Sequence, residues 1–322
     1  MPSTAATANT VSRWLNYLVA LPMVILGTFG AILTIIIFTR RNSFLRNPTV
    51  QYLLAGAVMT ALHLPSVYLQ GILVDGFGLG IYNTNIIVCR EHRYLFYSTT
   101  VATISFPCWA AFDQYVSTSR EATVRRRWSS IRMTRFVIVG TIIFWSIVYM
   151  PIIFIVSIAS GSCAFIDSPL SRLNDYFVTP VAYTIAPLTV VIICMRGIIR
   201  NLQSNRVHNH NNNLKIQVRR MLIPQLIILS ISGVPFGLYS IYTQATSKTQ
   251  KDASRLAIEH LFLQIIRLFY HLNFVCSFYT YFYRSKEMRK VLKRLIYGLI
   301  RRNQIEPADV SLANTFSLNT VV

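Results

Sequence analysis

Seven stretches of 24 to 28 mostly apolar residues constrain this chain more than any other feature of its sequence. At about 1.5 Å of rise per helical residue, each can cross the hydrocarbon core of a bilayer, which is about 30 Å thick. Segments this long and apolar satisfy their backbone hydrogen bonds in lipid as helices rather than as barrel strands. The sequence therefore predicts an all-α membrane protein. The expected spans are residues 15–38, 48–73, 94–117, 134–157, 176–199, 217–243 and 256–283.

The basic residues are distributed unevenly between these spans. A net charge of +20 would suggest a nucleic-acid partner in a soluble protein. Here 23 of the 31 Lys and Arg lie in, or within four residues of, the first, third and fifth gaps and the segment after the last span. The positive-inside rule places these parts in the cytoplasm and the N-terminus outside. We therefore expect a multi-pass plasma-membrane protein whose basic rim attracts anionic lipids, and no nucleic-acid partner.

The segments outside the spans are short. Residues 1–14 are expected to form a short extracellular N-terminus with no removable signal peptide. Residues 15–283 contain the spans, and residues 303–322 are expected to be a disordered cytoplasmic tail. The last residues, Thr320-Val321-Val322, fit the carboxyl-terminal ligand of a PDZ domain, although so short a match also arises by chance.

Two of the five cysteines lie at the outer membrane edge. Cys89 and Cys163 can meet an oxidising compartment, whereas Cys108, Cys194 and Cys276 lie in apolar span interiors as small buried side chains. We predict one disulfide, between Cys89 and Cys163. It ties the outer end of the third span to the second outer loop and stabilises the fold by a few kcal/mol.

A resemblance to a known family begins at the inner end of the third span. Ala111-Phe112-Asp113-Gln114-Tyr115 resembles the Asp-Arg-Tyr signature of rhodopsin-like G-protein-coupled receptors, and Cys89 lies 24 residues before Asp113, as in that family. Further similar motifs follow in order: Arg46-Asn47-Pro48-Thr49, Trp145, Pro187, Pro235-Phe236 and Ser277-Phe278-Tyr279-Thr280-Tyr281. Residues 284–302 look like the family's amphipathic basic helix 8. The resemblance covers about residues 15–297 and implies a seven-transmembrane helix bundle with a short amphipathic eighth helix.

The chain departs from the family at several polar positions. Ala31, Thr60 and Ser277 replace the Asn, Asp and Asn that line an internal sodium and water site in typical members, so we expect that site to be absent. Gly233 replaces a tryptophan, and Gln114 replaces the signature arginine. Gln114 can form hydrogen bonds but has no charge to pair with Asp113. The resemblance assigns activation and G-protein coupling to Asp113, Gln114, Tyr115, Pro235 and Tyr281, and for Pro235 a purely static bend is the alternative.

Two polar stripes run along the expected helices. His260, Gln264, Arg267 and His271 share one face of the last span, and Arg90, Arg93, Tyr97 and Thr100 share one face of the third. An arginine in mid-span turns toward a cavity or a partner. The alternative is that Arg267 and His271 only hold neighbouring helices together.

The resemblance places these stripes around an outer ligand pocket. Phe96 stands where amine receptors carry their aspartate, so a biogenic amine is not expected. Arg93 and Arg267 would attract an anionic ligand group, unless Glu91 and Glu259 neutralise them. Tyr183, Phe236 and Tyr239 serve either as aromatic walls or only in packing. The predicted ligand-binding set is Arg93, Phe96, Tyr97, Thr100, Tyr183, Phe236, Tyr239, Arg267 and His271.

These observations lead to one main functional hypothesis. The chain is expected to be a G-protein-coupled receptor that binds an extracellular peptide or small ligand and activates a heterotrimeric G protein. The alternative is a seven-span channel or transporter that uses the polar stripe as a path. We expect no enzyme, because clustered histidines and acids or a nucleophile–base pair are missing from the sequence, and no cofactor or metal.

Overall fold

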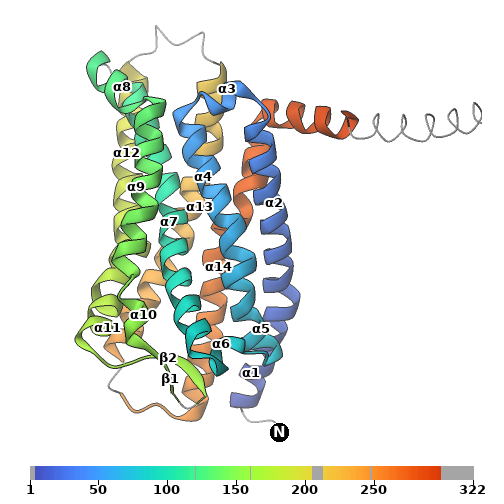
Figure 1. Ribbon diagram of the computed structural model, residues 1–322, viewed down its shortest axis with the longest axis vertical. Coiled ribbons are helices and arrows are strands. Elements are labelled where there is room, and N and C mark those ends of the chain that lie inside the picture. The colour runs from blue at the N-terminus through green and yellow to red at the C-terminus, as the bar shows by residue number, and fades with distance from the viewer. Residues whose placement is uncertain (1–3, 120, 160, 205–212, 247–248, 299–322) are drawn as a thin grey trace, which may run out of the picture.

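The computed structural model describes residues 4–119, 121–159, 161–204, 213–246 and 249–298. Long helices run side by side along one axis, and a short hairpin lies at one end of them (Figure 1). The predicted tail at 303–322, with Thr320-Val321-Val322, lies outside the described residues.

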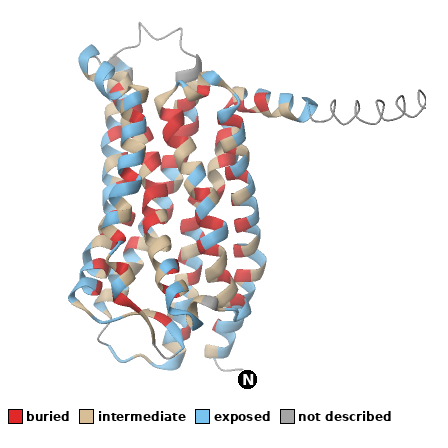
Figure 2. Ribbon diagram, viewed as in Figure 1, coloured by how far each residue is buried: buried red, intermediate tan, exposed pale blue. Residues whose placement is uncertain are grey.

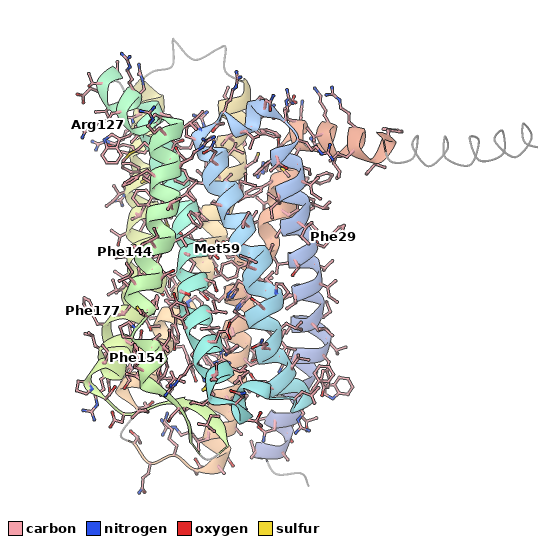
Figure 3. All side chains as sticks on the ribbon, viewed as in Figure 1. Phe29, Met59, Arg127, Phe144, Phe154 and Phe177 are labelled. Atoms are coloured by element: carbon pink, nitrogen blue, oxygen red, sulfur yellow. A yellow bond between two sulfur atoms is a disulfide. The ribbon has the colours of Figure 1, made fainter. Side chains whose placement is uncertain are left out.

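Six helical stretches in the described ranges are long and apolar enough to cross a membrane, and the chain is therefore an all-α, multi-pass membrane protein. Buried residues concentrate on the inward faces of the helices (Figure 2). Large apolar side chains point outward and are exposed, as Phe29, Phe144, Phe154 and Phe177 show in Figure 3. Surface of this kind is unfavourable in water and favourable in lipid. The six stretches are Thr4–Thr39, Pro48–Phe77, Ile131–Ile155, Pro169–Asn201, Ile216–Ala245 and Ala253–Arg284.

The first stretch is continuous through α1 (Thr4–Leu15), the π-helical turn η1 (Asn16–Ala20) and α2 (Leu21–Thr39). Helical structure begins at Thr4, before residue 15, where the first span was expected to start. Asn16 is buried, and its side-chain oxygen accepts a hydrogen bond from Gln264 Nε2 at 2.6 Å. This bond holds the first stretch against the last helix, α14 (Ala253–Arg284).

The second stretch follows the short helix α3 (Asn42–Leu45) and comprises α4 (Pro48–His63), η2 (Leu64–Tyr68) and α5 (Leu69–Phe77). Asn47 caps α4, because its side-chain oxygen accepts from the Val50 amide at 3.3 Å. Gly78 ends α5 at φ 68°, in the left-handed region that glycine adopts without strain.

The helix at the centre of the bundle is α7 (Ile86–Thr118). It contacts α4, α9 (Ile131–Tyr149), α12 (Ala186–Ser204) and α13 (Asn213–Ala245). It has the length of a span but is not one of the six, since it carries charges and many hydroxyls. Thr99, Thr100 and Thr103 bond to backbone carbonyls four residues earlier, which satisfies their hydroxyls inside the bundle. The prediction of a seventh span depends on α7 and stays a prediction.

Prolines and π-helical turns occur close together at the hairpin end. η2 contains Pro65, and η4 (Val181–Ile185) lies between Pro180 and Pro187. A proline removes a backbone donor, and a π-turn accommodates the resulting break in the helical hydrogen bonds. The smaller elements that connect the long helices are α6 (Ile81–Thr84), α8 (Ala122–Trp128), α10 (Ile152–Ile155), α11 (Pro169–Leu173) and η3 (Asn174–Val178).

The hairpin consists of β1 (Val156–Ala159) and β2 (Ser162–Phe165), which pair antiparallel. Cys163 of β2 forms a disulfide with Cys89 of α7, as predicted, with 5.7 Å between the Cα atoms. The side chain of Asn83 in α6 accepts from the Cys163 amide at 3.0 Å. The disulfide and this bond attach the hairpin to the end of α7.

At the opposite end, residues 286–298 form a further helical segment that projects sideways from the bundle (Figure 1). The guanidinium of Arg41 forms an ion pair with Glu287. This pair holds the pKa of the Glu287 carboxyl below its usual value of 4.5. The contact joins the segment to the start of α3.

Candidate ligand-binding cavity

A cavity of about 470 Å³ opens among the helices at the hairpin end. Each of the four π-turns contributes to its wall, through Asn16, Tyr68, Asp175 and Tyr183. A π-turn inserts one extra residue per turn, which widens the space between helices. The volume lies within the range of about 300 to 1,000 Å³ that small-ligand sites occupy.

All of the residues predicted to bind a ligand line this one cavity. α7 supplies Arg93, Phe96, Tyr97 and Thr100, and the other five come from η4, α13 and α14. The stripe on α14 faces the cavity along its length, because His260, Gln264, Arg267 and His271 all line it. The structure brings the stripe on α14 together with Arg93, Tyr97 and Thr100 of α7. Arg90, the fourth residue of the predicted α7 stripe, does not line the cavity, and its Nε donates to the Val156 carbonyl oxygen at 3.3 Å. Their ligand-binding role stays a prediction.

Arg93 is held by the hairpin. Its Nη2 donates to the carbonyl oxygen of Cys163 at 2.8 Å, and its guanidinium lies 5.9 Å from the centre of the Phe165 ring. A guanidinium over an aromatic face gains a cation–π interaction. The disulfide partner thereby fixes the direction of the Arg93 side chain.

Arg267 has an acidic neighbour that was not predicted from the sequence. Asp75 of α5 lies 3.7 Å from Arg267, measured from Oδ2 to Nη1. The alternative that Glu259 neutralises an arginine of the cavity does not hold, because Glu259 pairs with Lys251 at 2.6 Å and with Arg255 at 3.0 Å. A helix end that extends past residue 73 explains the difference, since it carries Asp75 to the cavity.

The deeper part of the cavity is aromatic. Phe236 of α13 stacks near Tyr183 at 5.6 Å and near Tyr270 of α14 at 4.9 Å, between ring centres. Tyr97 of α7 lies edge-on to Tyr183 at 6.3 Å. Rings at these distances and tilts attract one another and offer a flat apolar surface. The aromatic walls therefore come from four different elements. The same rings also pack against one another, so the wall role and the packing role occur together.

A stack of rings lies beside this surface. His271 lies almost parallel to Tyr68 at 3.7 Å and to His63 at 5.8 Å. The Nδ1 atom of His271 contacts the Arg267 carbonyl oxygen at 2.7 Å, and His63 Nδ1 contacts the Thr99 hydroxyl at 2.8 Å. Both imidazole rings are thus fixed in orientation. On the other side, Tyr82 of α6 stacks on His92, and burial raises the pKa of Tyr82.

Several buried polar atoms around the cavity have no hydrogen-bond partner among the described residues. Native interiors leave few such atoms, because an unpaired buried donor or acceptor costs about 1–3 kcal/mol. Their concentration at one cavity marks a place where a polar molecule can complete the hydrogen bonds. These atoms are Tyr68 Oη, His92 Nδ1, Arg93 Nε, Thr179 Oγ1, Tyr270 Oη and His271 Nε2.

Several residues of the cavity were not predicted from the sequence. Asp75 and Asp175 each lie next to the outer edge of a predicted span, and an acidic residue there is a signal that could have been used. Asn16 lies at the start of the first span, where the helix reaches farther out than expected. Tyr68 and Tyr270 gave no signal beyond aromatic character, since only the fold reveals which side they face.

The residues assigned to activation lie near the opposite end. Gln114 Nε2 donates to the Thr49 hydroxyl at 2.7 Å, and that hydroxyl donates to Asp113. The Ser129 hydroxyl also donates to Asp113, at 2.7 Å. Asp113 is thus satisfied by hydroxyl groups of α4 and of the loop after α8. These hydrogen bonds join three parts of the chain.

The other assigned residues connect the outer helices of the bundle. Tyr115 packs against Gly197 of α12 so closely that an added Cβ would meet its ring. Tyr281 donates to the side chain of Gln225 in α13, whose amide donates to Ser277 at 3.2 Å. Pro235 lies inside α13 beside the aromatic surface. The bonds of Gln225 couple α13 to α14, and the contact of Tyr115 with Gly197 couples α7 to α12. The role of these residues in switching stays a prediction.

Within the described ranges no group of three or more His, Cys, Asp or Glu side chains could hold a metal ion. Cys108, Cys194 and Cys276 are free. A scan of protein-family models gave no match to this chain, and a search of curated proteins gave no match either.

Proposed function

We propose that this chain is a seven-helix receptor of the rhodopsin-like kind. In it, α7 also crosses the membrane, in addition to the six apolar stretches, and is the third span in chain order. α7 has 33 residues, or about 50 Å at the usual helical rise, and it lies among six helices that can cross a membrane. A helix surrounded by protein does not need an apolar surface on all sides. Its hydroxyls bond within the helix, so its polarity does not count against a membrane location.

The receptor sits in the plasma membrane with its N-terminus outside. Arg127 and the other arginines of α8 lie at one end of the bundle, and the disulfide and the hairpin lie at the other (Figure 3). Basic residues favour the cytoplasmic side, and a disulfide favours the outer, oxidising side. Both observations support the same orientation, and it makes the cavity accessible from outside.

An extracellular ligand binds in the cavity. The observation that carries this proposal is the group of buried, unpartnered polar atoms on its wall, together with a volume suited to a small molecule. Such a ligand would contact α7, α13 and α14 at once. A ligand that prefers one arrangement of these helices over another shifts the population of the two arrangements.

The inner face engages a heterotrimeric G protein. Asp113, Gln114 and Thr49 lie at that end, at the contact of α7 with α4. Displacement of α13 relative to α14 would change the contacts of Tyr281 with Gln225, because these residues connect the two helices. Opening of the inner face would then expose the basic ends of the helices to the G protein.

Cells that express the full chain test this proposal. A panel of organic acids, amino acids, short peptides and neutral volatiles is applied while G-protein dissociation and membrane conductance are recorded together. A receptor gives ligand-dependent dissociation without current. Current without dissociation would contradict the proposal and favour a channel.

A further inference from the structure

The cavity contains charges of both signs in equal number. Arg93, Arg267, Asp75 and Asp175 all line it, so the formal charge of these described residues is balanced. A ligand with a single negative charge would bring an excess charge into a partly buried site, which is unfavourable. A ligand that carries one positive and one negative group preserves the balance.

The pair of Arg267 and Asp75 is loosely made. A separation of 3.7 Å is longer than the 2.7–3.2 Å or so of a hydrogen bond to a nitrogen donor. Arg267 donates no hydrogen bond to any described residue, although its guanidinium carries several N–H groups. The two side chains are 36% and 24% exposed, and both line the cavity. A ligand that carries a hydrogen-bond acceptor and a donor close together can therefore bind Arg267 with the acceptor and Asp75 with the donor.

An apolar surface lies next to this pair. Tyr270 follows Arg267 on the same face of α14 and packs against Phe236 at 4.9 Å, between ring centres. Ring faces here are suited to a flat or branched apolar group. The polar pair and the aromatic surface together describe a ligand with a compact charged head and an apolar body.

We propose that the ligand class is an α-amino acid with an aromatic or large aliphatic side chain. Its carboxylate binds Arg267, its ammonium group binds Asp75, and its side chain lies against Phe236 and Tyr270. The two charged groups of an α-amino acid lie on one carbon atom, which matches the closeness of Arg267 and Asp75. A dipeptide separates its termini by a peptide unit and fits this pair less well. This proposal rests on the proposed function and specifies its ligand.

The proposal is tested with the purified full chain in nanodiscs. Phenylalanine, tyrosine, tryptophan and leucine are compared with three capped forms of each: the N-acetyl acid, the amino amide and the N-acetyl amide. Binding is measured by calorimetry and by the shift of the melting temperature. At least one free amino acid is expected to bind at least about tenfold more tightly than its singly capped forms, which corresponds to about 1.4 kcal/mol.

Two variants assign the charged groups. Arg267→Gln is expected to weaken the free amino acid at least about tenfold while the amino amide, which lacks the carboxylate, changes little. Asp75→Asn is expected to weaken the free amino acid similarly while the N-acetyl acid changes little. This crossed pattern distinguishes a local effect from misfolding. The matched controls are Arg172→Gln and Asp167→Asn, because these residues form an exposed ion pair away from the cavity.

Each outcome has a definite meaning. Preferential binding of the N-acetyl acids would overturn the proposal in favour of an anionic ligand. Failure of every free amino acid to bind, or equal loss for all probes in both variants, would overturn it as well. In either case the receptor function stands if another member of the panel drives G-protein dissociation, and it falls separately if none does.

Discussion

Gln114 donates a hydrogen bond to the Thr49 hydroxyl, with 2.7 Å between nitrogen and oxygen, and thereby links α7 to α4 at the end of the bundle opposite the hairpin. The same hydroxyl donates to Asp113. A buried carboxylate needs strong donors, and Thr49 and Ser129 provide them. Gln114 therefore takes part in this hydrogen-bond network at the position where an arginine was expected.

The first prediction concerns this link. Thr49→Val removes the hydroxyl, so Gln114 loses its acceptor and Asp113 loses one donor. Because these groups are buried, we expect the free energy of unfolding to fall by about 1–3 kcal/mol and basal G-protein dissociation to rise. Thr39→Val is the control, because the Thr39 hydroxyl bonds only to carbonyls of its own helix. Equal stability and equal basal signal in the two variants would contradict the assigned role.

The second prediction concerns the disulfide. Cys89→Ser releases the hairpin and with it the Cys163 carbonyl that orients Arg93. We expect a loss of about 2–4 kcal/mol in stability and weaker ligand binding. The measurement is thermal unfolding in detergent with and without reductant. Cys276→Ser, which removes a free thiol, should behave as wild type. A Cys89→Ser variant that remains sensitive to reductant would argue against this disulfide.

The third prediction concerns close packing of the first two stretches and α14. A Cβ at Gly27 would lie 2.5 Å from the Leu64 Cδ1 atom and 3.0 Å from the Val275 Cγ2 atom. Gly27→Ala should therefore destabilise the bundle by about 1–3 kcal/mol through overpacking. Gly140→Ala is the matched control and should leave the stability unchanged, since nothing lies within 4 Å of its added Cβ. If both variants unfold at the same temperature, the helices are not packed as described.

The fourth prediction concerns pH at the inner face. The pKa of Glu287 is held below 4.5 mainly by the hydrogen bond from Arg41. A carboxyl with a lowered folded pKa stabilises the fold above its unfolded pKa and loses this contribution as the pH falls through the folded value. The attachment of residues 286–298 should thus weaken below about pH 4.5, by no more than about 1 kcal/mol. A spin label at Leu295 would report it, and Glu287→Gln should abolish the change. Identical pH profiles for the wild type and for Glu287→Gln would contradict the ion pair between Arg41 and Glu287.

Much of the fold could be predicted from apolar length and from charge. The described helices that can cross a membrane match six predicted spans, and the disulfide between Cys89 and Cys163 is present. The helix ends were harder. α1 begins before residue 15 and α5 ends after residue 73. The partners of Asn16 and Asp75 in the folded chain, Gln264 and Arg267, are not visible along a linear sequence.

The cavity could be predicted in part. Spacing of three and four residues placed Arg93 and Thr100 on one face of α7 and Arg267 and His271 on one face of α14, and all of them line the cavity. The acidic partner of Arg267 could not be assigned, because Glu259 was nearer in sequence and only the fold shows that it faces Lys251. Long-range pairing of charges depends on helix packing, which a single sequence does not specify.

The central claim is that occupation of the outer cavity drives G-protein activation. Gly71 lines the cavity, and an added Cβ would meet no atom within 4 Å. Gly71→Leu should therefore fill ligand space without disturbing the packed helices. Ligand-dependent G-protein dissociation, recorded at equal surface expression, is predicted to lose at least about tenfold in potency in Gly71→Leu, while Gly140→Leu responds as wild type. An unchanged response in Gly71→Leu would contradict the account.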